Sequence, residues 1–536
     1  MGDQGSTRRN LLRAGGALAT GVGIAACADT QRRASASASS SASGSAWSTG
    51  STGPGGTTGQ PLAATGGNWA ALAKELTGTL IRPGDSRYGE AAELFQPRFD
   101  SIRPAAVAYV ASAQDVAICL AFARRYRVPI VPRNGGHSYA GWSSVSNGLV
   151  IDLGRLSAVH ASGSVGAGAR LIDVYSGLAA AGRTIPAGSC PSVGVSGLTL
   201  GGGVGVTGRA NGLTCDSLTG AQIVTADGRI REVNARQDAD LFWALRGAGG
   251  GNFGVVTRLD FRTHAADDCS YGFLSWPWSK AAAVIQAWQA WAPTAPDALW
   301  ANLHLSASYD GRLRIASTVN LLGGSRTELG NLVDRLHPST ASLHSASYLT
   351  TMQVMGGVAG ESVAKAHVHG SLPGHNPAGT VGRSSYGARS DFFTRRLSGA
   401  GAAAVVAAVA RYPRTAPSGG RAAVAFDALG GAINRVGARN TAFVHRDALF
   451  MAQYTADYPA GVTGGAAADR GWAWINGTWN AMRPYASGEA YQNYIDPQLR
   501  NWEAAYYGAN AARLRQVKRA YDPSGLFHFP QGIPLG

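Results

Sequence analysis

Two glycine-rich stretches about fifty residues apart each carry one nucleophilic side chain. Residues 133–141 (R-N-G-G-H-S-Y-A-G) contain His137, and residues 188–203 (G-S-C-P-S-V-G-V-S-G-L-T-L-G-G-G) contain Cys190. Glycine has no Cβ and reaches positive φ at no steric cost, so such loops can turn their N–H groups towards phosphate oxygens. The two stretches are therefore predicted to hold a dinucleotide, with His137 and Cys190 bonded to it.

Each of these nucleophiles has an ordinary alternative explanation. A single histidine in a turn often serves only as a hydrogen-bonding group, and a single cysteine often behaves as a small buried residue. Because thiolate is the nucleophilic form, Cys190 also needs a lowered pKa, for which nearby backbone dipoles are one source. The glycines that flank both side chains favour cofactor attachment over these alternatives.

Three other patterns point to different classes of protein. Residues 247–254 have Rossmann-like glycine spacing, but a helix is predicted before them and a β-branched strand after them, which is the reverse of a Rossmann loop. Residues 194–198 break the serine-hydrolase elbow G-x-S-x-G at its last glycine. His367 and His369 would share one face of a strand, as metal ligands do, but no cysteine and few carboxylates lie near them in the sequence. Nicotinamide-binding, hydrolase and metal-dependent functions are therefore disfavoured.

Length, charge and cysteine content narrow the remaining classes. The 536 residues are too many for one compact core, so two domains are expected. The formal net charge is +15, but arginines are spread along the chain without a basic block or a nucleic-acid motif. A basic solvated surface is favoured over nucleic-acid binding, and acidic polymers remain open as partners. Five cysteines without a C-x-x-C pair argue against a zinc site and against a disulfide-built scaffold.

Residues 1–33 have the features of an export signal. The sequence T-R-R-N-L-L resembles the twin-arginine pattern, and the apolar run Ala14–Ala26 has 13 residues, fewer than the roughly 20 needed to span a bilayer. Twin-arginine export moves folded proteins, which suits an enzyme that acquires its cofactor before it leaves the cytoplasm. Residues 24–27 (I-A-A-C) resemble a lipobox, so lipidation of Cys27 and simple cleavage beside it remain alternatives.

The segment that follows, residues 34–67, is dominated by Ser, Ala, Gly and Thr. Such a segment cannot bury enough apolar surface to offset the entropy lost on ordering, so a flexible tether is predicted. The mature protein is then expected outside the cell or tethered to the outer face of the membrane, with membrane contact only through a lipid on Cys27. A monomer is expected.

From about Asn68 the sequence becomes globular. Ser112 followed by Asp115 has the pattern of a helix N-terminus. A hairpin is predicted over residues 221–233, turning at Asp227-Gly228. The other predicted elements are strands at 128–131, 149–153 and 255–261 and helices at 169–182 and 240–246. From about residue 264 to 484 glycine triplets vanish and tryptophan becomes frequent, which indicates a second domain.

Six ordered motifs together resemble those of one known family, although any one alone would be unspecific. The chain is similar to the berberine bridge enzyme-like oxidases of the vanillyl-alcohol oxidase and p-cresol methylhydroxylase flavoprotein superfamily, over roughly residues 68–536. Besides the two glycine-rich stretches, the motifs are R-G-A-G-G-G-N-F-G-V-V-T at 246–257, D-A-L-G-G-A-I-N-R-V at 427–436, Y-Q-N-Y-I-D at 491–496 and a C-terminal segment that begins Y-Y-G-A-N-A-A-R.

The resemblance implies an α+β fold in two parts. Residues 68–263 and 485–536 would form a two-part FAD-binding domain of the p-cresol methylhydroxylase type, and residues 264–484 an inserted α+β substrate domain built on an antiparallel sheet. It also implies bicovalent FAD, with His137 joined to the flavin 8α-methyl group and Cys190 to C6. The implied cofactor-binding residues are Arg133, Asn134, Gly135, Gly136, His137, Ser138, Gly141, Gly188, Cys190, Val193, Gly194, Gly197, Gly202, Gly205, Val256 and Asn493.

Oxidation of a C–OH group needs a base for the hydroxyl proton and an acceptor for hydride, here flavin N5. The resemblance places a tyrosine base within residues 491–494. In a strand, Tyr491 and Asn493 would share one face and Tyr494 the other, so Tyr491 is the expected base, with Tyr494 packed near the flavin. Asp427 matches a carboxylate that assists the tyrosine in some carbohydrate-oxidising relatives. The alternative for both tyrosines is a packing role in an aromatic core.

These features predict an exported FAD-dependent oxidase that acts on an alcohol or a sugar, with O2 as acceptor and H2O2 as product. Val193 matches a position where a small residue accompanies fast reaction with oxygen in plant relatives, and the frequent tryptophans favour carbohydrate. Oxidative tailoring of a secondary metabolite (a polyketide or glycoside, or a ring closure) and a non-enzymatic binding lipoprotein are the alternatives. Asn134, Ala248 and Arg389 depart from the family pattern in ways compatible with FAD binding, and Arg389 could alter substrate contacts.

Overall fold

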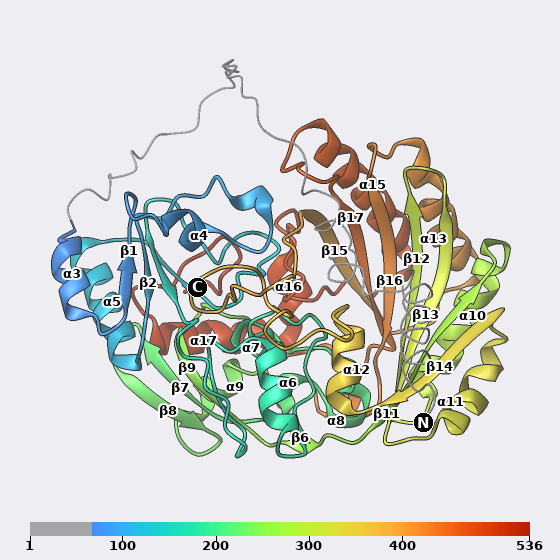
Figure 1. Ribbon diagram of the computed structural model, residues 1–536, viewed down its shortest axis with the longest axis horizontal. Coiled ribbons are helices and arrows are strands. Elements are labelled where there is room, and N and C mark those ends of the chain that lie inside the picture. Colours follow the sequence, from blue (N-terminus) through green and yellow to red (C-terminus); the bar gives the residue numbers. More distant parts are fainter. Residues whose placement is uncertain (1–66) are drawn as a thin grey trace, which may run out of the picture.

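The computed structural model describes residues 67–536 of the chain. The predicted export signal at 1–33, nearly all of the tether at 34–67 and the candidate lipid site Cys27 lie outside the described residues. Within the described part, helices are combined with two four-stranded sheets, one seven-stranded sheet and one two-stranded sheet (Figure 1). The predicted α+β fold class is therefore confirmed.

The first four-stranded sheet delivers the stretch that contains His137. Its strands lie in the order β1 (Thr79–Ile81), β2 (Ala106–Tyr109), β4 (Leu149–Asp152) and β3 (Ile130–Arg133). Strands β2, β4 and β3 are parallel and almost wholly buried, as expected for strands covered on both faces. Helix α5 (Ala113–Tyr126) makes the crossover from β2 to β3. As predicted, Ser112 caps this helix, because its hydroxyl oxygen accepts a hydrogen bond from the Asp115 N–H at 3.2 Å.

The second four-stranded sheet is antiparallel. Its strands lie in the order β5 (Ser164–Gly166), β9 (Gly254–Phe261), β7 (Leu218–Thr225) and β8 (Ile230–Asn234). The predicted hairpin is confirmed, since β7 and β8 pair around Asp227-Gly228 with Gly228 at φ +85°. Residues 247–253 lie between helix α9 (Ala239–Ala244) and strand β9, which begins at Gly254. This order of elements confirms that the glycine-rich segment is not a Rossmann loop.

The seven-stranded sheet occupies the middle of the sequence and is antiparallel throughout. Its strands lie in the order β14 (Thr340–Ala346), β11 (Cys269–Trp276), β13 (Leu313–Leu322), β12 (Leu299–Ser308), β16 (Arg421–Ala428), β17 (Phe450–Asp457) and β15 (Tyr386–Phe393). Its outer face is covered by α10 (Ala281–Trp291), α11 (Arg326–Val333), α13 (Gly399–Arg411) and α15 (Ala466–Met482) (Figure 1). Along β12, Leu303 and Leu305 join the core beneath these helices, so the alternating Asn302 and His304 face the other way.

The remaining elements are short and connect the sheets. They are α3 (Trp69–Glu75), α4 (Tyr88–Ala92), α6 (Leu171–Ala179), α7 (Val195–Leu200), α8 (Gly208–Asn211), α12 (Tyr348–Met355), α14 (Ala432–Arg435), α16 (Trp502–Tyr507), α17 (Ala511–Tyr521) and the pair β6 (Arg183–Thr184) and β10 (His264–Ala265). Helix α6 corresponds to the helix predicted over 169–182. Between residues 67 and 536, no helix combines the length and apolar character needed to cross a bilayer.

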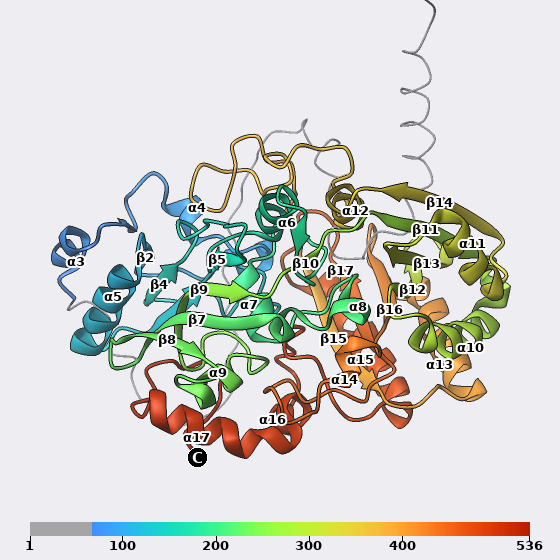
Figure 2. The same cartoon turned by 90° about the horizontal axis from the view of Figure 1, so that it is seen from below.

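The C-terminal segment returns to the first half of the chain, where α17 lies alongside α9 (Figure 2). Tyr507 donates a hydrogen bond through its hydroxyl to the Ala248 carbonyl at 2.8 Å. Lys518 is buried, donates to the Asn252 carbonyl at 2.7 Å and pairs with Asp522 at 2.7 Å. These contacts fix the loop after α9 from the far end of the sequence.

Replacing Lys518 by Met is expected to lower the free energy of unfolding by about 3 kcal/mol, because Asp522 would remain buried without its cation. Chemical denaturation measures this change. Lys365→Met is the matched control, since Lys365 pairs with Glu361 at a site where its side chain is 52% exposed. A loss below about 1 kcal/mol is expected there. Equal losses in the two variants would contradict the role assigned to Lys518.

Candidate active site

A cavity of about 330 Å³ lies between the first half of the chain and the inner face of the seven-stranded sheet. Its wall combines both glycine-rich stretches, the loop after α9, side chains from β12, β15, β16 and β17, and residues 491–495. The predicted site residues that line it are Arg133, Asn134, Gly135, Gly136, His137, Ser138, Gly188, Cys190, Val193, Gly194, Gly197, Gly205, Val256, Asp427, Tyr491, Asn493 and Tyr494.

Arg133 fixes the start of the loop that carries His137. Its buried guanidinium pairs with Asp152, with Nε 2.5 Å from Oδ2, and donates a hydrogen bond to the Ala91 carbonyl at 2.8 Å. A buried cation with a carboxylate and a carbonyl partner is well satisfied. Arg133 therefore anchors the loop at the end of β3, and its positive charge is balanced by Asp152.

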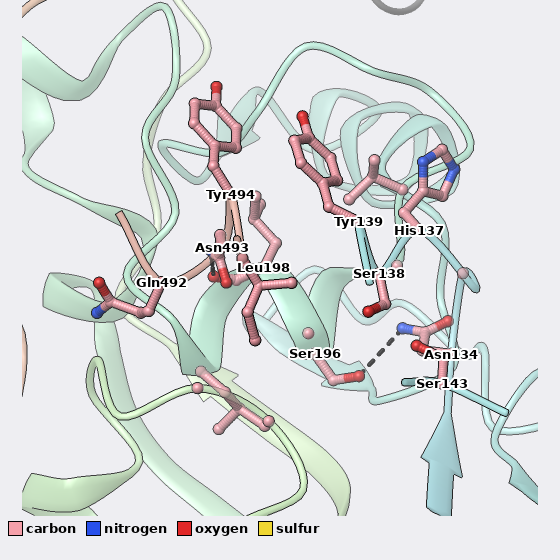
Figure 3. Close-up of a pocket in the computed structure, with 18 of the residues that line it drawn as sticks. Asn134, His137, Ser138, Tyr139, Ser143, Ser196, Leu198, Gln492, Asn493 and Tyr494 are labelled. Carbon is pink, nitrogen blue, oxygen red and sulfur yellow. Dashed lines mark hydrogen bonds between the residues drawn. The ribbon is translucent and has the colours of Figure 1, made fainter. Parts of the chain in front are cut away.

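The two glycine-rich stretches touch through their backbones. A Cβ at Gly135 would lie 2.5 Å from the Gly194 nitrogen, and a Cβ at Gly194 would overlap the Asn134 side chain. Asn134 adds a direct link, because its Nδ2 donates a hydrogen bond to the Ser196 hydroxyl at 3.1 Å (Figure 3). Glycine is needed at 135 and 194 for this close approach, which brings the two stretches into one wall.

His137 lies in this wall, where neighbouring side chains fix the orientation of its ring. Its ring stacks on Phe95 with centroids 3.9 Å apart, and Nε2 lies 3.0 Å from the Ser192 hydroxyl oxygen. Burial, reinforced by the nearby Arg170 cation, lowers the pKa of His137 to about 3. The imidazole is therefore neutral at ordinary pH, the form that can act as a nucleophile.

Cys190 faces the same cavity from the second stretch, next to Val193. The Val193 N–H donates to the Cys190 carbonyl at 3.3 Å, and Ser192 between them is the partner of His137. The two predicted attachment residues are thus held on one wall. A thioether at this position forms from the thiolate of Cys190.

The prediction of a strand over residues 491–494 is wrong, because these residues form a turn. The Tyr494 N–H donates to the Tyr491 carbonyl at 2.9 Å, and Asn493 Nδ2 donates to the Leu198 carbonyl at 2.9 Å. The face argument that favoured Tyr491 over Tyr494 therefore has no structural basis.

The hydroxyl group of Tyr491 is held by three hydrogen-bond donors. Its hydroxyl oxygen accepts hydrogen bonds from Gly203 N at 3.0 Å, Val204 N at 3.2 Å and Asn493 Nδ2 at 2.9 Å, and the residue is only 2% exposed. Burial raises the pKa of Tyr491 to about 12, although these hydrogen bonds act in the opposite direction. Three donors already surround this oxygen, so a substrate hydroxyl would have to displace one of them to reach it.

Tyr494 instead lies in a cluster of polar aromatic side chains on the cavity wall. Its ring is parallel to that of Tyr139, with centroids 5.4 Å apart and an angle of 7° (Figure 3). Gln453 Nε2 donates to the Tyr139 hydroxyl at 2.8 Å, and Tyr386 packs edge-on against Tyr139. Burial holds the pKa of Tyr494 well above its usual value, and the neighbouring Tyr139 and Asp427 reinforce the shift.

Asp427 supplies a carboxyl group to the same cavity from the end of β16. It lies opposite Asn302 on β12 and Met451 on β17 in the sheet register. Burial raises the pKa of Asp427 to about 7. A carboxyl group with this pKa can give up or take a proton near neutrality, which is the property of a general base.

Two predicted cofactor-binding glycines do not line the cavity. Gly141 has φ +74° and a Cβ there would lie 2.7 Å from Phe99, whereas Gly202 has φ +117° and a Cβ there would lie 2.7 Å from Phe443. Both glycines are required by backbone conformation and packing instead. Arg389 also lies away from the cavity lining, because it is buried in an ion pair with Asp496 at 2.7 Å.

Several lining side chains belong to no motif. They are Phe95, Trp300, Tyr386, Met451 and Gln453. The one sequence signal available was Gln453, a polar residue within the apolar strand F-M-A-Q-Y-T-A-D. Alternation along that strand places it on the face opposite the helices.

The cavity fits an extended cofactor with hydrogen-bond donors. Gly197 has no heavy atom within 4 Å of a Cβ position, and the loop after α9 contributes Gly249, Gly250 and Gly251 to the wall. The buried oxygens Gln492 Oε1 and Gln531 Oε1 have no partner within the described residues although both side chains line the cavity. Buried acceptors without partners are rare and suit the N–H and O–H groups of a bound dinucleotide.

Comparison with known proteins agrees with this geometry. A family model described as FAD binding domain matches residues 104–234, and one described as Berberine and berberine like matches residues 490–534. The FAD-linked oxidoreductase YgaK of Bacillus subtilis is 32% identical over 473 residues, which cover 86% of this chain and 97% of YgaK. Chitooligosaccharide oxidase of Gibberella zeae is 29% identical over 80% of this chain and 87% of its own. The structure of Physcomitrella patens BBE-like 1 superposes with a TM-score of 0.76 and 29% identity, covering 87% of this chain and 99% of that one.

Fold, cavity and relatives together define an FAD-dependent oxidoreductase. The chain belongs to the berberine bridge enzyme-like family of FAD-linked oxidoreductases, as its ordered motifs predicted. This membership removes the alternative of a non-enzymatic binding protein.

Gly194→Ala is expected to reduce the amount of FAD that copurifies with the protein. The added methyl group would push the second stretch away from Asn134, at an overpacking cost of about 1–3 kcal/mol. Visible flavin absorbance relative to protein absorbance measures the loss. Gly399→Ala is the control, because a Cβ at Gly399 in the first turn of α13 would meet no heavy atom within 4 Å. Full flavin content in Gly194→Ala would show that the close approach is dispensable.

Proposed function

We propose that the protein is an exported oxidase that acts on an alcohol or sugar hydroxyl, with FAD bound through both His137 and Cys190 and O2 as electron acceptor. The observation that carries the proposal is that Asp427, Tyr494 and Tyr139 line the same cavity as the two glycine-rich stretches. When bound, FAD supplies the hydride acceptor at N5. A CH–OH group held in this cavity would meet a proton acceptor and the flavin together.

Tyr494 is the base that we assign, with Asp427 as its partner. The Tyr494 hydroxyl takes the substrate proton while its own proton moves to the Asp427 carboxylate. This arrangement avoids a free phenolate, which the high pKa of Tyr494 disfavours. Tyr139 supports the pair by stacking on Tyr494, and Gln453 fixes the Tyr139 hydroxyl.

Covalent attachment through His137 is supported by its neutral imidazole and its place on the cavity wall. The bond would join an imidazole nitrogen to the flavin 8α carbon, and Nε2 is already engaged by Ser192, which leaves Nδ1. Bond formation displaces two electrons and two protons, which O2 accepts to give one H2O2. A thioether between Cys190 and flavin C6 has the same balance and starts from the reduced thiol.

A sugar is the substrate class that the cavity favours. Trp300 and Tyr386 offer aromatic surfaces, and Gln453 and Asp427 offer polar groups on the same wall. Aromatic faces with a few fixed hydrogen-bonding groups suit a carbohydrate ring. The relative named chitooligosaccharide oxidase supports this choice. Val193 on the cavity wall is a small residue that leaves space for O2 beside the attachment site.

Export through the twin-arginine signal and tethering through Cys27 complete the proposal. They rest on residues 1–33 alone, and a protein that must bind FAD before it crosses a membrane would need a pathway for folded chains.

The protein is expected to release H2O2 when incubated with one or more sugars from a panel of mono- and oligosaccharides and phenolic alcohols. Tyr494→Phe is expected to lower kcat by about 10²–10⁴-fold with its flavin retained, because the substrate proton then has no acceptor. Tyr491→Phe is the matched variant: it is expected to lose flavin or stability more than kcat per flavin. The assignment of the base is wrong if Tyr491→Phe, and not Tyr494→Phe, abolishes flavin reduction in the loaded enzyme. If the protein releases H2O2 with none of these sugars and alcohols, the proposed activity is contradicted.

The rate of flavin reduction by substrate is expected to rise with pH up to about 7 and then level, because only ionised Asp427 can accept a proton. Below that pH the rate should fall about tenfold per unit, as one protonation predicts. Stopped-flow absorbance at saturating substrate measures the profile. Asp427→Asn is expected to be slow and flat with pH, so an unchanged profile in this variant would exclude Asp427 as the titrating group.

A further inference from the structure

Arg170 is a buried cation that has no carboxylate partner among residues 67–536. It is 5% exposed, and one terminal nitrogen (NH1) donates both to Asn134 Oδ1 and to the Gly168 carbonyl, the latter at 3.0 Å. The neighbouring Arg133, by contrast, is paired with Asp152. A buried charge without an ion-pair partner is costly, and such groups are concentrated at functional sites.

The backbone around Arg170 is bonded to the stretch that contains Cys190. Leu171 N donates to the Val193 carbonyl at 3.0 Å, and Ile172 N donates to the Pro191 carbonyl at 3.1 Å. Arg170 itself forms an isolated antiparallel bridge with Gly194. Its backbone therefore belongs to one wall of the cofactor cavity.

The side chain of Arg170 reaches the other stretch. Its bond to Asn134 lies three residues before His137, on the loop where the Gly135 backbone meets Gly194. Asn134 in turn donates to the Ser196 hydroxyl. One residue thus joins the two predicted attachment loops, through its backbone on one side and its guanidinium on the other.

The Arg170 guanidinium lies behind the Gly135–Gly136 backbone and does not line the cofactor cavity. It lines a separate polar cavity of about 30 Å³ behind Gly135 and Gly136, which it shares with Asp152 and His375. A Cβ at Gly374 would lie 2.6 Å from the Arg170 Cζ, so only a glycine lets that loop close over the charge. The cation is shielded from water and held towards the loop of His137, where it helps to keep the imidazole unprotonated.

We propose that Arg170 is a positioning residue for flavin attachment, which holds the Asn134–His137 loop against the Cys190 stretch so that the imidazole meets the flavin 8α carbon. The proposal rests on the covalent FAD of the proposed function. It assigns to Arg170 a role in forming the N–C bond to His137, whose two displaced electrons pass to O2. Retention of FAD by the cavity does not depend on this role.

Peptide mass spectrometry of the purified full-length protein, reduced and digested, tests the proposal. It measures the fraction of His137 peptide and of Cys190 peptide that carries flavin, while acid precipitation measures the FAD that is released. In Arg170→Met the flavin-bearing fraction of His137 peptide is expected to fall about tenfold, as for a small misplacement of a reacting group. Total FAD and the Cys190 fraction should stay near wild type. Arg170→Lys, which keeps the charge and one donor, is expected to restore part of the His137 linkage.

Arg209→Met is the control for loss of a buried arginine. Arg209 is 1% exposed and donates to the carbonyls of Leu299 at 2.8 Å and Ala295 at 2.6 Å, and it does not line the cofactor cavity. This variant should lose thermal stability with an unchanged His137 linkage. If Arg170→Met is insoluble, Asn134→Ala replaces it, with Ser196→Ala as its control. Asn134→Ala removes both the acceptor of Arg170 and the donor to Ser196, whereas Ser196→Ala removes only the second contact.

The outcomes separate the role of Arg170 from the proposed function. Suppose that the wild type carries covalent flavin. A normal His137 linkage in Arg170→Met, or in Asn134→Ala when that variant replaces it, then overturns the role of Arg170 and leaves the proposed function standing. A parallel loss of both linkages and of FAD, matched by Arg209→Met, also overturns it, because any buried arginine would then suffice. A wild type whose FAD is wholly released by acid overturns covalent attachment, and with it the role of Arg170.

Discussion

The site depends on two segments of backbone that approach more closely than any side chain would allow. Where Gly135 meets Gly194, the loop after β3 and the stretch before α7 become one surface. The first is held by the buried pair of Arg133 and Asp152, the second by backbone hydrogen bonds with residues 169–172, and the Arg170 side chain links the two. Because both sides are held, an imidazole and a sulfur from distant parts of the sequence face one cavity without needing a ligand to gather them.

The two halves of the structure contribute different chemistry. The first half supplies a wall of glycine backbone, which can surround a dinucleotide because it has few side chains in the way. The seven-stranded sheet supplies functional groups on its inner face, while its outer face is committed to the helices. Asp427 and Gln453 project from adjacent strands of this rigid support. A sheet holds such groups more firmly than a loop would, which suits proton transfer over a short distance.

Local patterns in the sequence were sufficient where local physics decides the structure. The cap at Ser112, the turn at Gly228 and the order of helix and strand around residues 247–254 all follow from neighbouring residues. The segment 491–494 could not be predicted in this way. Its Y-Q-N-Y pattern alternates as a strand would, but Tyr491 and Asn493 are bound by Gly203, Val204 and Leu198, almost three hundred residues earlier. Likewise, a glycine required for packing against Phe99 or Phe443 has the same sequence signature as one that faces a ligand.

The cavity wall is completed by residues from the last tenth of the chain, among them Tyr494 and Gln531. Both glycine-rich stretches and the whole seven-stranded sheet therefore precede this part of the wall in the sequence. The wall that would surround the cofactor is therefore incomplete in any chain that stops before these residues. Full-length synthesis is thus a condition for a complete cofactor cavity.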